Sequence, residues 1–300
     1  MKVIFCNSVL DPKKVDPLYE REFAAARSAG FGLGLLSHEA LVDEQDVPQA
    51  LSRIPIAEKP SRAIYRGWMM REEAYQLLYE ALREKNLELI NDPLAYGEGH
   101  LFPRSFELIQ AKSPRSVIIP KEDMRDPAVI QAALASLTGG AIVKDYVKSL
   151  KHHWEEACYI PDLRDEKQAN QVINRFIELQ GESLVGGLVL REYVALNKLT
   201  EHSQSGMPLS EEYRIFWVNG QIMQVLPYWE EGVYQAAPKL DPAILAIGKQ
   251  VGSKFFTMDI AKTAEGEWII MELGDGQVAG LPEQTDVEMF YQKLRELCVG

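Results

Sequence analysis

The chain has 300 residues, 46% hydrophobic and 25% charged, an ordinary balance for a globular protein of about two domains. Its net charge of −12 argues against a broad basic surface, so nucleic-acid and membrane partners are disfavoured. No apolar run approaches the roughly 18 residues of a membrane span, and the N-terminus lacks a signal-peptide pattern. The three cysteines have neither paired nor metal-ligand spacing, which suits a reducing compartment. We expect a cytoplasmic protein, with a homodimer favoured only because dimers are common.

Strand-like and helix-like patterns alternate over the first hundred residues. This alternation, with short connections, predicts a small α/β layer with a parallel sheet. We assign it to residues 1–98 and expect the segment YGEGH, residues 96–100, to be the hinge that leads out of it. The predicted strands cover residues 2–6, 30–37, 61–68 and 87–92, and the predicted helices cover 17–29 and 71–86.

From residue 99 onward the pattern changes to strands joined by tight turns. Asn219-Gly220 divides the run EYRIFWVNGQIMQVLPYW and is the strongest short hairpin signal, because a type I′ turn needs positive φ at both central residues. We expect a second domain over residues 99–300, with lobes at about 99–192 and 193–300 and antiparallel sheets. Its other predicted strands cover residues 116–120, 141–147 and 184–196, and its helices cover 104–111, 127–137, 165–180 and 243–255.

The stretch FFTMDIAKTAEGEWIIMELGDG, residues 255–276, places one carboxylate in each of two apolar runs. A two-residue turn at Glu265-Gly266, or a four-residue loop, puts Asp259 directly opposite Glu272. Like charges in that position repel, and a divalent cation such as Mg²⁺ between them removes the repulsion. A three- or five-residue loop is the alternative, and it shifts the register so that the two acids face opposite sides.

Basic residues interrupt two other apolar strands. Lys144 lies within AIVKDYV, where its ammonium needs a partner such as a phosphate, unless the strand is an edge and the side chain reaches solvent. Arg214 has core-like neighbours and also needs an anion, for which Glu212 is the plain structural alternative. The chain has no GxxxxGK[ST] motif, so phosphate contacts would come from side chains.

The run LVGGLVLREYVAL ends in Arg191, Glu192, Tyr193 and Val194. Backbone groups at the end of such a strand can hydrogen-bond a planar base, with Tyr193 and Val194 on either side of it. Taken alone, this is a weak signal.

The order of IVKDYVKS, LVLREYV, EYRIFWVNGQI and FFTMDIAKTAEGEWIIMELGDGQVAGL resembles the ATP-grasp superfamily over nearly the whole chain. It is most similar to the clade named for one arginine and two lysines, whose members are mostly regarded as amide-forming ligases. The resemblance implies a Rossmann-like domain that precedes a two-lobed ATP-grasp domain, with ATP and Mg²⁺ bound between the lobes.

The resemblance also implies residue roles. Lys144 matches the lysine at the α- and β-phosphates, Lys148 falls in the loop that closes over the triphosphate, and Arg214 matches the catalytic basic residue near the γ-phosphate. The clade's arginine is Arg104, in LFPRSFEL, with Arg191 as the competitor. The adenine hinge matches Glu192, Tyr193 and Val194.

The metal carboxylates match Asp259 and Glu272. Relatives usually have Glu-x-Asn at the second metal strand, whereas this chain reads Glu272-Leu273-Gly274, and Asp275 is the candidate replacement for the missing ligand. The phosphate loop reads KSLKHH and lacks the usual glycines.

The function implied is an ATP-dependent, ADP-forming ligase that joins a carboxylate to an amine through an acyl phosphate. Besides ATP, its partner would be an unknown carboxylate and amine substrate, such as a peptide or an amino acid. The rivals are a kinase-like or nucleic-acid end-joining enzyme and a catalytically silent nucleotide-binding protein. A protein whose strand charges are all structural is the remaining alternative.

Overall fold

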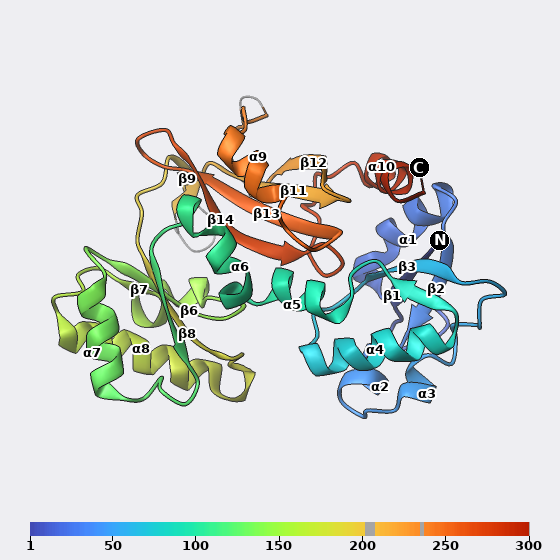
Figure 1. The fold of residues 1–300 in the computed structure, drawn as a ribbon, viewed down its shortest axis with the longest axis horizontal. Coiled ribbons are helices and arrows are strands. Elements are labelled where there is room, and N and C mark those ends of the chain that lie inside the picture. Colours follow the sequence, from blue (N-terminus) through green and yellow to red (C-terminus); the bar gives the residue numbers. More distant parts are fainter. Residues whose placement is uncertain (202–207, 235–236, 300) are drawn as a thin grey trace.

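The computed structural model describes residues 1–201, 208–234 and 237–299. Figure 1 shows an N-terminal α/β domain beside two further lobes, with helices α5 and α6 between them. The N-terminal sheet is parallel, as predicted, and its strands lie in the order β2-β1-β3-β4. Its strands are β1 (Lys2–Cys6), β2 (Gly32–Leu36), β3 (Ser61–Arg66) and β4 (Leu87–Leu89), and its helices are α1 (Glu20–Ser28), α2 (His38–Val42), α3 (Val47–Ala50) and α4 (Glu72–Glu84).

Helices cover both faces of this sheet because successive side chains of a strand point to opposite sides. Ile4 joins the cluster under α4, whereas Val3 and Phe5 join the cluster on the other face. The second cluster includes Phe290 and Leu294 of α10 (Val287–Val299), which packs beside α1. The C-terminal helix, which the sequence analysis did not predict, thus returns to the N-terminal domain (Figure 1).

A buried ion pair ties the N-terminal domain to the segment after the last strand. Arg66 binds Glu22 through two hydrogen bonds of 2.9 Å. The same guanidinium donates to the carbonyls of Gly276, at 2.8 Å, and Ala279, at 2.9 Å. Because the pair is also hydrogen-bonded to backbone, its charge is well compensated in the interior.

Residues 96–100 are not an open hinge. They form the second half of α5 (Pro93–His100), which Asp92 caps at the N-terminus through a 2.8 Å bond to the Ala95 amide. A Cβ at Gly97 would lie 2.2 Å from Nη1 of Arg104, and one at Gly99 would lie 3.1 Å from the Asp275 amide. The glycines that suggested a hinge instead allow close packing of α5 against α6 (Phe102–Ile109) and the last strand.

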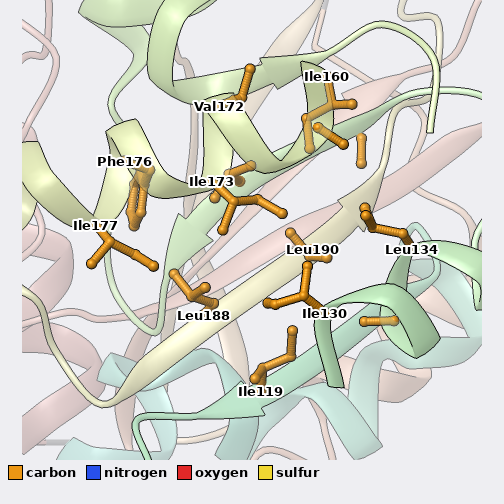
Figure 2. Close-up of a cluster of buried hydrophobic side chains, with 14 of the residues drawn as sticks. Ile119, Ile130, Leu134, Ile160, Val172, Ile173, Phe176, Ile177, Leu188 and Leu190 are labelled. Carbon is orange, nitrogen blue, oxygen red and sulfur yellow. The ribbon is translucent and has the colours of Figure 1, made fainter. Parts of the chain in front are cut away.

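The first lobe is an antiparallel sheet in the order β5-β8-β6-β7, covered by two helices. Its core lies between the sheet and the helices (Figure 2), and ten labelled apolar residues from both layers contribute to it. The strands are β5 (Ser116–Pro120), β6 (Ala141–Asp145), β7 (Tyr159–Ile160) and β8 (Gly187–Glu192), and the helices are α7 (Pro127–Ser136) and α8 (Glu166–Gln180).

The second lobe is an antiparallel sheet in the order β12-β11-β13-β14. Asn219 and Gly220 have φ of 49° and 74°, which confirms the predicted type I′ turn. The small β9-β10 sheet was not predicted, and α9 ends at residue 248, before its predicted end. The elements are β9 (Lys198–Glu201), β10 (Pro208–Ser210), β11 (Glu212–Val218), β12 (Gln221–Pro227), α9 (Pro242–Gly248), β13 (Phe255–Lys262) and β14 (Trp268–Asp275).

Five short helical turns complete the described structure. Four are three-residue 3₁₀ turns and the fifth is a π-helical turn. They are η1 (Pro17–Tyr19), η2 (Gln110–Lys112), η3 (Lys151–His153), η4 (Trp154–Cys158, the π turn) and η5 (Gly181–Ser183).

The loop between β13 and β14 differs from the two-residue turn that the sequence suggested. Thr263 pairs with Glu267 through a 2.8 Å bond, so three residues form the loop, and Gly266 adopts a φ of 90°. A three-residue loop alone would separate the two strand acids. A β-bulge at Met271 inserts one extra residue into β14, and Asp259 therefore lies directly opposite Glu272.

Candidate functional site

The two opposed acids are each bonded to a cation from a different part of the sheet system. Arg214 of β11 lies directly opposite Asp259 of β13 and donates to both of its carboxylate oxygens, at 2.9 Å and 2.7 Å. Lys144 of β6 reaches Oε2 of Glu272 at 2.9 Å. The acids are thus held in place by a bidentate arginine and by a lysine from the other lobe.

Both structural alternatives for these cations are excluded. β6 lies between β8 and β7, and Lys144 is 4% exposed, so it does not extend from an edge strand into solvent. Glu212 does not pair with Arg214 but accepts a hydrogen bond of 3.1 Å from Nε1 of Trp229. The charged side chains of these strands, Lys144 and Arg214, therefore meet at the acid pair Asp259 and Glu272.

The surroundings shift the pKa values of the two carboxylates in opposite directions. Burial raises the pKa of Asp259, which Arg214 opposes. Burial also disfavours the charged form of Glu272, but Lys144 and Arg191 outweigh it and lower the pKa of that carboxyl to about 2. Glu272 is therefore ionised at every physiological pH.

Arg191 is the least satisfied charge of the site. It is 6% exposed, and its Nε and Nη2 atoms have no hydrogen-bond partner among the described residues. Its guanidinium lies 4.7 Å from the centroid of the Phe102 ring, and Nζ of Lys144 lies 5.2 Å from the same centroid. Burial lowers the pKa of Arg191. A buried guanidinium with free donors is a site for an anion, and phosphate fits its geometry.

A cavity of about 400 Å³ lies between the two lobes above these charges. A second cavity of about 200 Å³ continues from it, and Arg214 lines that one. Lys144, Lys148, Asp259 and Glu272 line both cavities. The first cavity brings together most of the residues expected from the sequence: Lys144, Lys148, Arg191, Glu192, Tyr193, Val194, Asp259 and Glu272.

The end of β8 forms the aromatic end of the first cavity. The carboxylate of Glu192 accepts hydrogen bonds from the amide and hydroxyl of Thr138, at 2.8 Å and 3.0 Å, so it anchors the strand end. Tyr193 is 41% exposed, and its ring centroid lies 4.8 Å from that of Tyr159 and 6.5 Å from that of Trp154. Flat rings at this end suit a planar ligand.

Arg104 does not belong to the cavity. It forms a salt bridge with Glu72 at 2.6 Å, is nearly half exposed and lines neither cavity. The expectation that Arg104 contacts the nucleotide is therefore not supported, and Arg191 is the buried arginine of the cleft. The periodicity of LFPRSFEL gave no indication that α4 would supply an acid beside it.

Asp275 lines the second cavity together with Asp259 and Glu272, but its carboxylate is bonded to other groups. It lies three residues beyond Glu272, hence on the opposite face of β14. Its carboxylate accepts hydrogen bonds from Nδ2 of Asn91 at 2.6 Å and from the amide of Gln277 at 2.9 Å. Burial raises its pKa to about 7. Its side chain thus links β14 to the N-terminal domain through Asn91, and its role as a third metal ligand stays a prediction. No group of three metal-binding side chains occurs among the described residues.

Lys151 and His100 are ionisable residues of the cavities to which the sequence analysis gave no role. Nζ of Lys151 lies over the rings of Tyr228 and Trp229, at 5.8 Å and 5.4 Å, and lines the first cavity. The run KDYVKSLKHHW contains several basic residues, but the sequence does not indicate which of them lines the cleft. His100 lines the second cavity, and a lone histidine after two glycines carried no signal.

Within the part of the chain that the structure describes, no helix is both long and apolar enough to cross a membrane. No curated protein matches the chain significantly.

Solved structures show the fold. A RimK domain ATP-grasp protein from Sphaerobacter thermophilus DSM 20745 is 12% identical, with a TM-score of 0.60, and the match covers 100% of this chain and 99% of that one. D-cycloserine synthetase DcsG is 12% identical, with a TM-score of 0.59 and 99% of each chain covered. The macrocyclase MdnC from Microcystis aeruginosa MRC, bound to the precursor peptide MdnA, is 13% identical, with a TM-score of 0.57 and 100% of each chain covered.

The family model described as "ATP-grasp domain, R2K clade family 3" matches residues 133–294, more than half of the chain. This range holds both lobes' cleft strands and all the cations and acids that converge there. The chain belongs to the ATP-grasp superfamily, in family 3 of the R2K clade.

Proposed function

We propose that this protein is an ATP-dependent ligase that joins a carboxylate to an amine through an acyl phosphate and releases ADP. The observation that carries the proposal is the opposed pair Asp259 and Glu272, held by Arg214 and Lys144 where the two cavities meet. A phosphoryl group there would lie between a nucleotide-sized space and a second, smaller space for its acceptor.

The first cavity supports nucleotide binding. Its volume of about 400 Å³ lies within the range of small-ligand pockets. Tyr193 and the strand end at Glu192 would receive the base, while Arg191, Lys144 and Lys148 would receive the phosphates. The two unpartnered donors of Arg191 fit this assignment, since a bound phosphate would satisfy them.

The opposed carboxylates fit a magnesium site. Asp259 and Glu272 supply the hard oxygen ligands that Mg²⁺ takes when it binds through one or two carboxylates and substrate phosphates. When bound, Mg²⁺ would neutralise phosphate charge and orient the phosphates.

The chain's own residues would position the reactants and offset charge. An oxygen of the substrate carboxylate would bond to the γ-phosphorus while the bond from that phosphorus to the bridging oxygen breaks, which releases ADP. Arg214 would hold the carboxylate and the transferred phosphoryl group, because it lines the second cavity beside Asp259. Lys144 and Lys148 would offset the remaining negative charge. Such positioning and electrostatic stabilisation account for most catalysis in phosphoryl transfer.

In the second step the amine nitrogen would bond to the acyl carbon, and inorganic phosphate would leave with the electron pair of the broken carbon–oxygen bond. We propose that the carboxylate belongs to an amino acid or a peptide. Two of the similar structures support this range, since their descriptions name D-cycloserine synthetase and a macrocyclase bound with a precursor peptide.

Hydroxylamine provides the test, because it captures acyl phosphates as hydroxamates whatever the natural amine is. The protein would be incubated with ATP, Mg²⁺ and hydroxylamine, and with each of the twenty amino acids or a set of peptides. We expect at least one carboxylate to give hydroxamate and ADP in equal amounts. Phosphorylated product without hydroxamate would indicate a kinase, AMP release would contradict the acyl-phosphate route, and nucleotide binding without turnover of any carboxylate would favour a silent nucleotide-binding protein.

A further inference from the structure

His100 ends α5 and lines the second cavity, on the side of the N-terminal domain. Its ring is held in a stack of three. Its centroid lies 5.0 Å from that of Tyr96, and Tyr96 stacks on Tyr75 at 3.9 Å with an angle of 6° between the planes. The Tyr96 hydroxyl donates to the Met70 carbonyl at 2.6 Å, which fixes the middle ring. The imidazole therefore has a defined position at the wall of the cavity.

The imidazole is neutral and has free nitrogens. Burial, together with the charge of Lys148, lowers the pKa of His100 to about 4. The structure records no hydrogen bond from the ring to any other described residue. One ring nitrogen of a neutral histidine carries a lone pair and can accept a proton.

Each of the other ionisable groups that line this cavity is a cation or is hydrogen-bonded to another protein group. Lys144, Lys148 and Arg214 are cations. The carboxylates of Asp259 and Glu272 are bonded to Arg214 and Lys144, and that of Asp275 is bonded to Asn91 and Gln277. Burial raises the pKa of Tyr146, so its hydroxyl stays protonated. Among the described residues of the second cavity, His100 is the neutral acceptor.

Amide formation from an amine needs such an acceptor. When the amine nitrogen bonds to the acyl carbon, it becomes a substituted ammonium, and one proton must leave before the amide is neutral. We propose that His100 accepts this proton, which makes it a catalytic base for the second half-reaction. The proposal rests on the proposed ligase function. The carbon–nitrogen bond forms, the carbon–oxygen bond to phosphate breaks, and the proton passes to the imidazole and then to water.

Bound phosphate strengthens this assignment. The charge of Lys148 weakens His100 as a base in the empty cleft, because a second positive charge nearby is unfavourable. Phosphate groups beside Lys148 would offset that charge. His100 would then be a better proton acceptor when a nucleotide or an acyl phosphate is present than when the cleft is empty.

The experiment compares two acceptors in H100Q. Hydroxylamine is a weakly basic nucleophile, and its nitrogen loses a proton to water readily after attack, so it does not depend on a protein base. With the carboxylate identified by hydroxamate formation, we expect H100Q to form hydroxamate within about threefold of wild type. Coupling to an ordinary primary amine should fall about 100-fold or more, the usual contribution of a general base. The KM for ATP should be unchanged.

Two further variants make the result specific. H100A should recover amine coupling when imidazole is added, because free imidazole can enter the space left by the side chain. H153Q is the matched control, since His153 is exposed, bonds Glu156 at 2.5 Å and lines neither cavity. It should behave as wild type with both acceptors.

The outcomes separate the two proposals. Amine coupling by H100Q at the wild-type rate, or an equal loss with amine and hydroxylamine, would overturn the role of His100 while leaving the ligase function intact. Absence of hydroxamate with wild-type protein would instead contradict the ligase function. If H100Q folds poorly, H100N and the imidazole response of H100A give the same comparison.

Discussion

Asp259 and Glu272 are direct cross-strand partners, and each is bonded to a cation. Without the bulge at Met271, the three-residue loop between their strands would turn the two acids to opposite faces. The register is therefore restored by an irregularity in β14 rather than by the turn. An arrangement that places like charges opposite each other, against the usual preference of sheets, indicates a functional requirement.

Asp259→Asn should reduce the proposed ATP turnover by about 100-fold or more, because the carboxylate orients Arg214 and would bind the metal of the proposed site. The amide keeps one acceptor for Arg214, so the fold should persist. ADP release in the hydroxylamine assay and the circular dichroism spectrum check both parts.

The matched control for this variant is Glu265→Gln, which removes one charge from the exposed loop of the same hairpin. It should leave turnover unchanged. Wild-type turnover in Asp259→Asn would contradict the metal site.

Lys144→Ala should weaken ATP binding by at least about tenfold, since it removes a buried charge from the proposed phosphate site and leaves Glu272 without its 2.9 Å partner. Isothermal titration calorimetry measures the affinity. Lys262→Ala is the control, because Lys262 lies on β13 but pairs with Glu211, at 3.2 Å, outside both cavities. Equal affinity in Lys144→Ala and the control would exclude the phosphate role.

Arg191→Met should have opposite effects on stability and on binding. The unliganded protein should be as stable as wild type or more stable, because a buried guanidinium with unpartnered donors is replaced by an apolar side chain. ATP binding should weaken by at least about tenfold. Thermal unfolding with and without ATP and Mg²⁺ measures both effects in one experiment.

Arg104→Met is the comparison for Arg191→Met. Its exposed bridge to Glu72 contributes at most about 1 kcal/mol, and its loss should not change ATP affinity. A loss of affinity in Arg104→Met alone would reverse the assignment of the cleft arginine.

Asp275 should make the stability of the protein depend on pH. Its folded-state pKa of about 7 is above the ordinary 3.8, so the folded protein binds the proton more tightly than the unfolded chain does. The free energy of unfolding should therefore fall as pH rises from about 4 to about 7 and level off above that, a component on the order of a few kcal/mol. Urea unfolding at several pH values measures it.

Asp275→Asn should remove this component, so its unfolding free energy should change less between pH 5 and pH 8 than that of the wild type. The same variant tests the site: Mg²⁺ dependence of turnover should match wild type. A large change in the Mg²⁺ concentration needed for turnover would show that Asp275 contributes to the metal site.

Much of the secondary structure, and part of the candidate site, could be predicted from local sequence features. The type I′ turn at Asn219-Gly220 follows from the φ angles that only a few residues tolerate. Most of the strands and helices follow from apolar periodicity, but the short strands β7, β9 and β10 do not. Lys144 and Arg214 were identifiable because a charge inside an apolar strand needs a partner wherever the strand lies. Those features depend on a residue and its near neighbours.

Only the tertiary structure decided which residues pair with the remaining charged side chains. Glu72 draws Arg104 away from the cleft, and Asn91 fixes Asp275 on the far face of β14, and both partners come from the N-terminal domain. The position of His100 likewise depends on tertiary packing, because its ring stacks on Tyr96, which stacks on Tyr75. A sequence states which charges must be neutralised, but which residue neutralises each one depends on contacts that only the folded chain brings together.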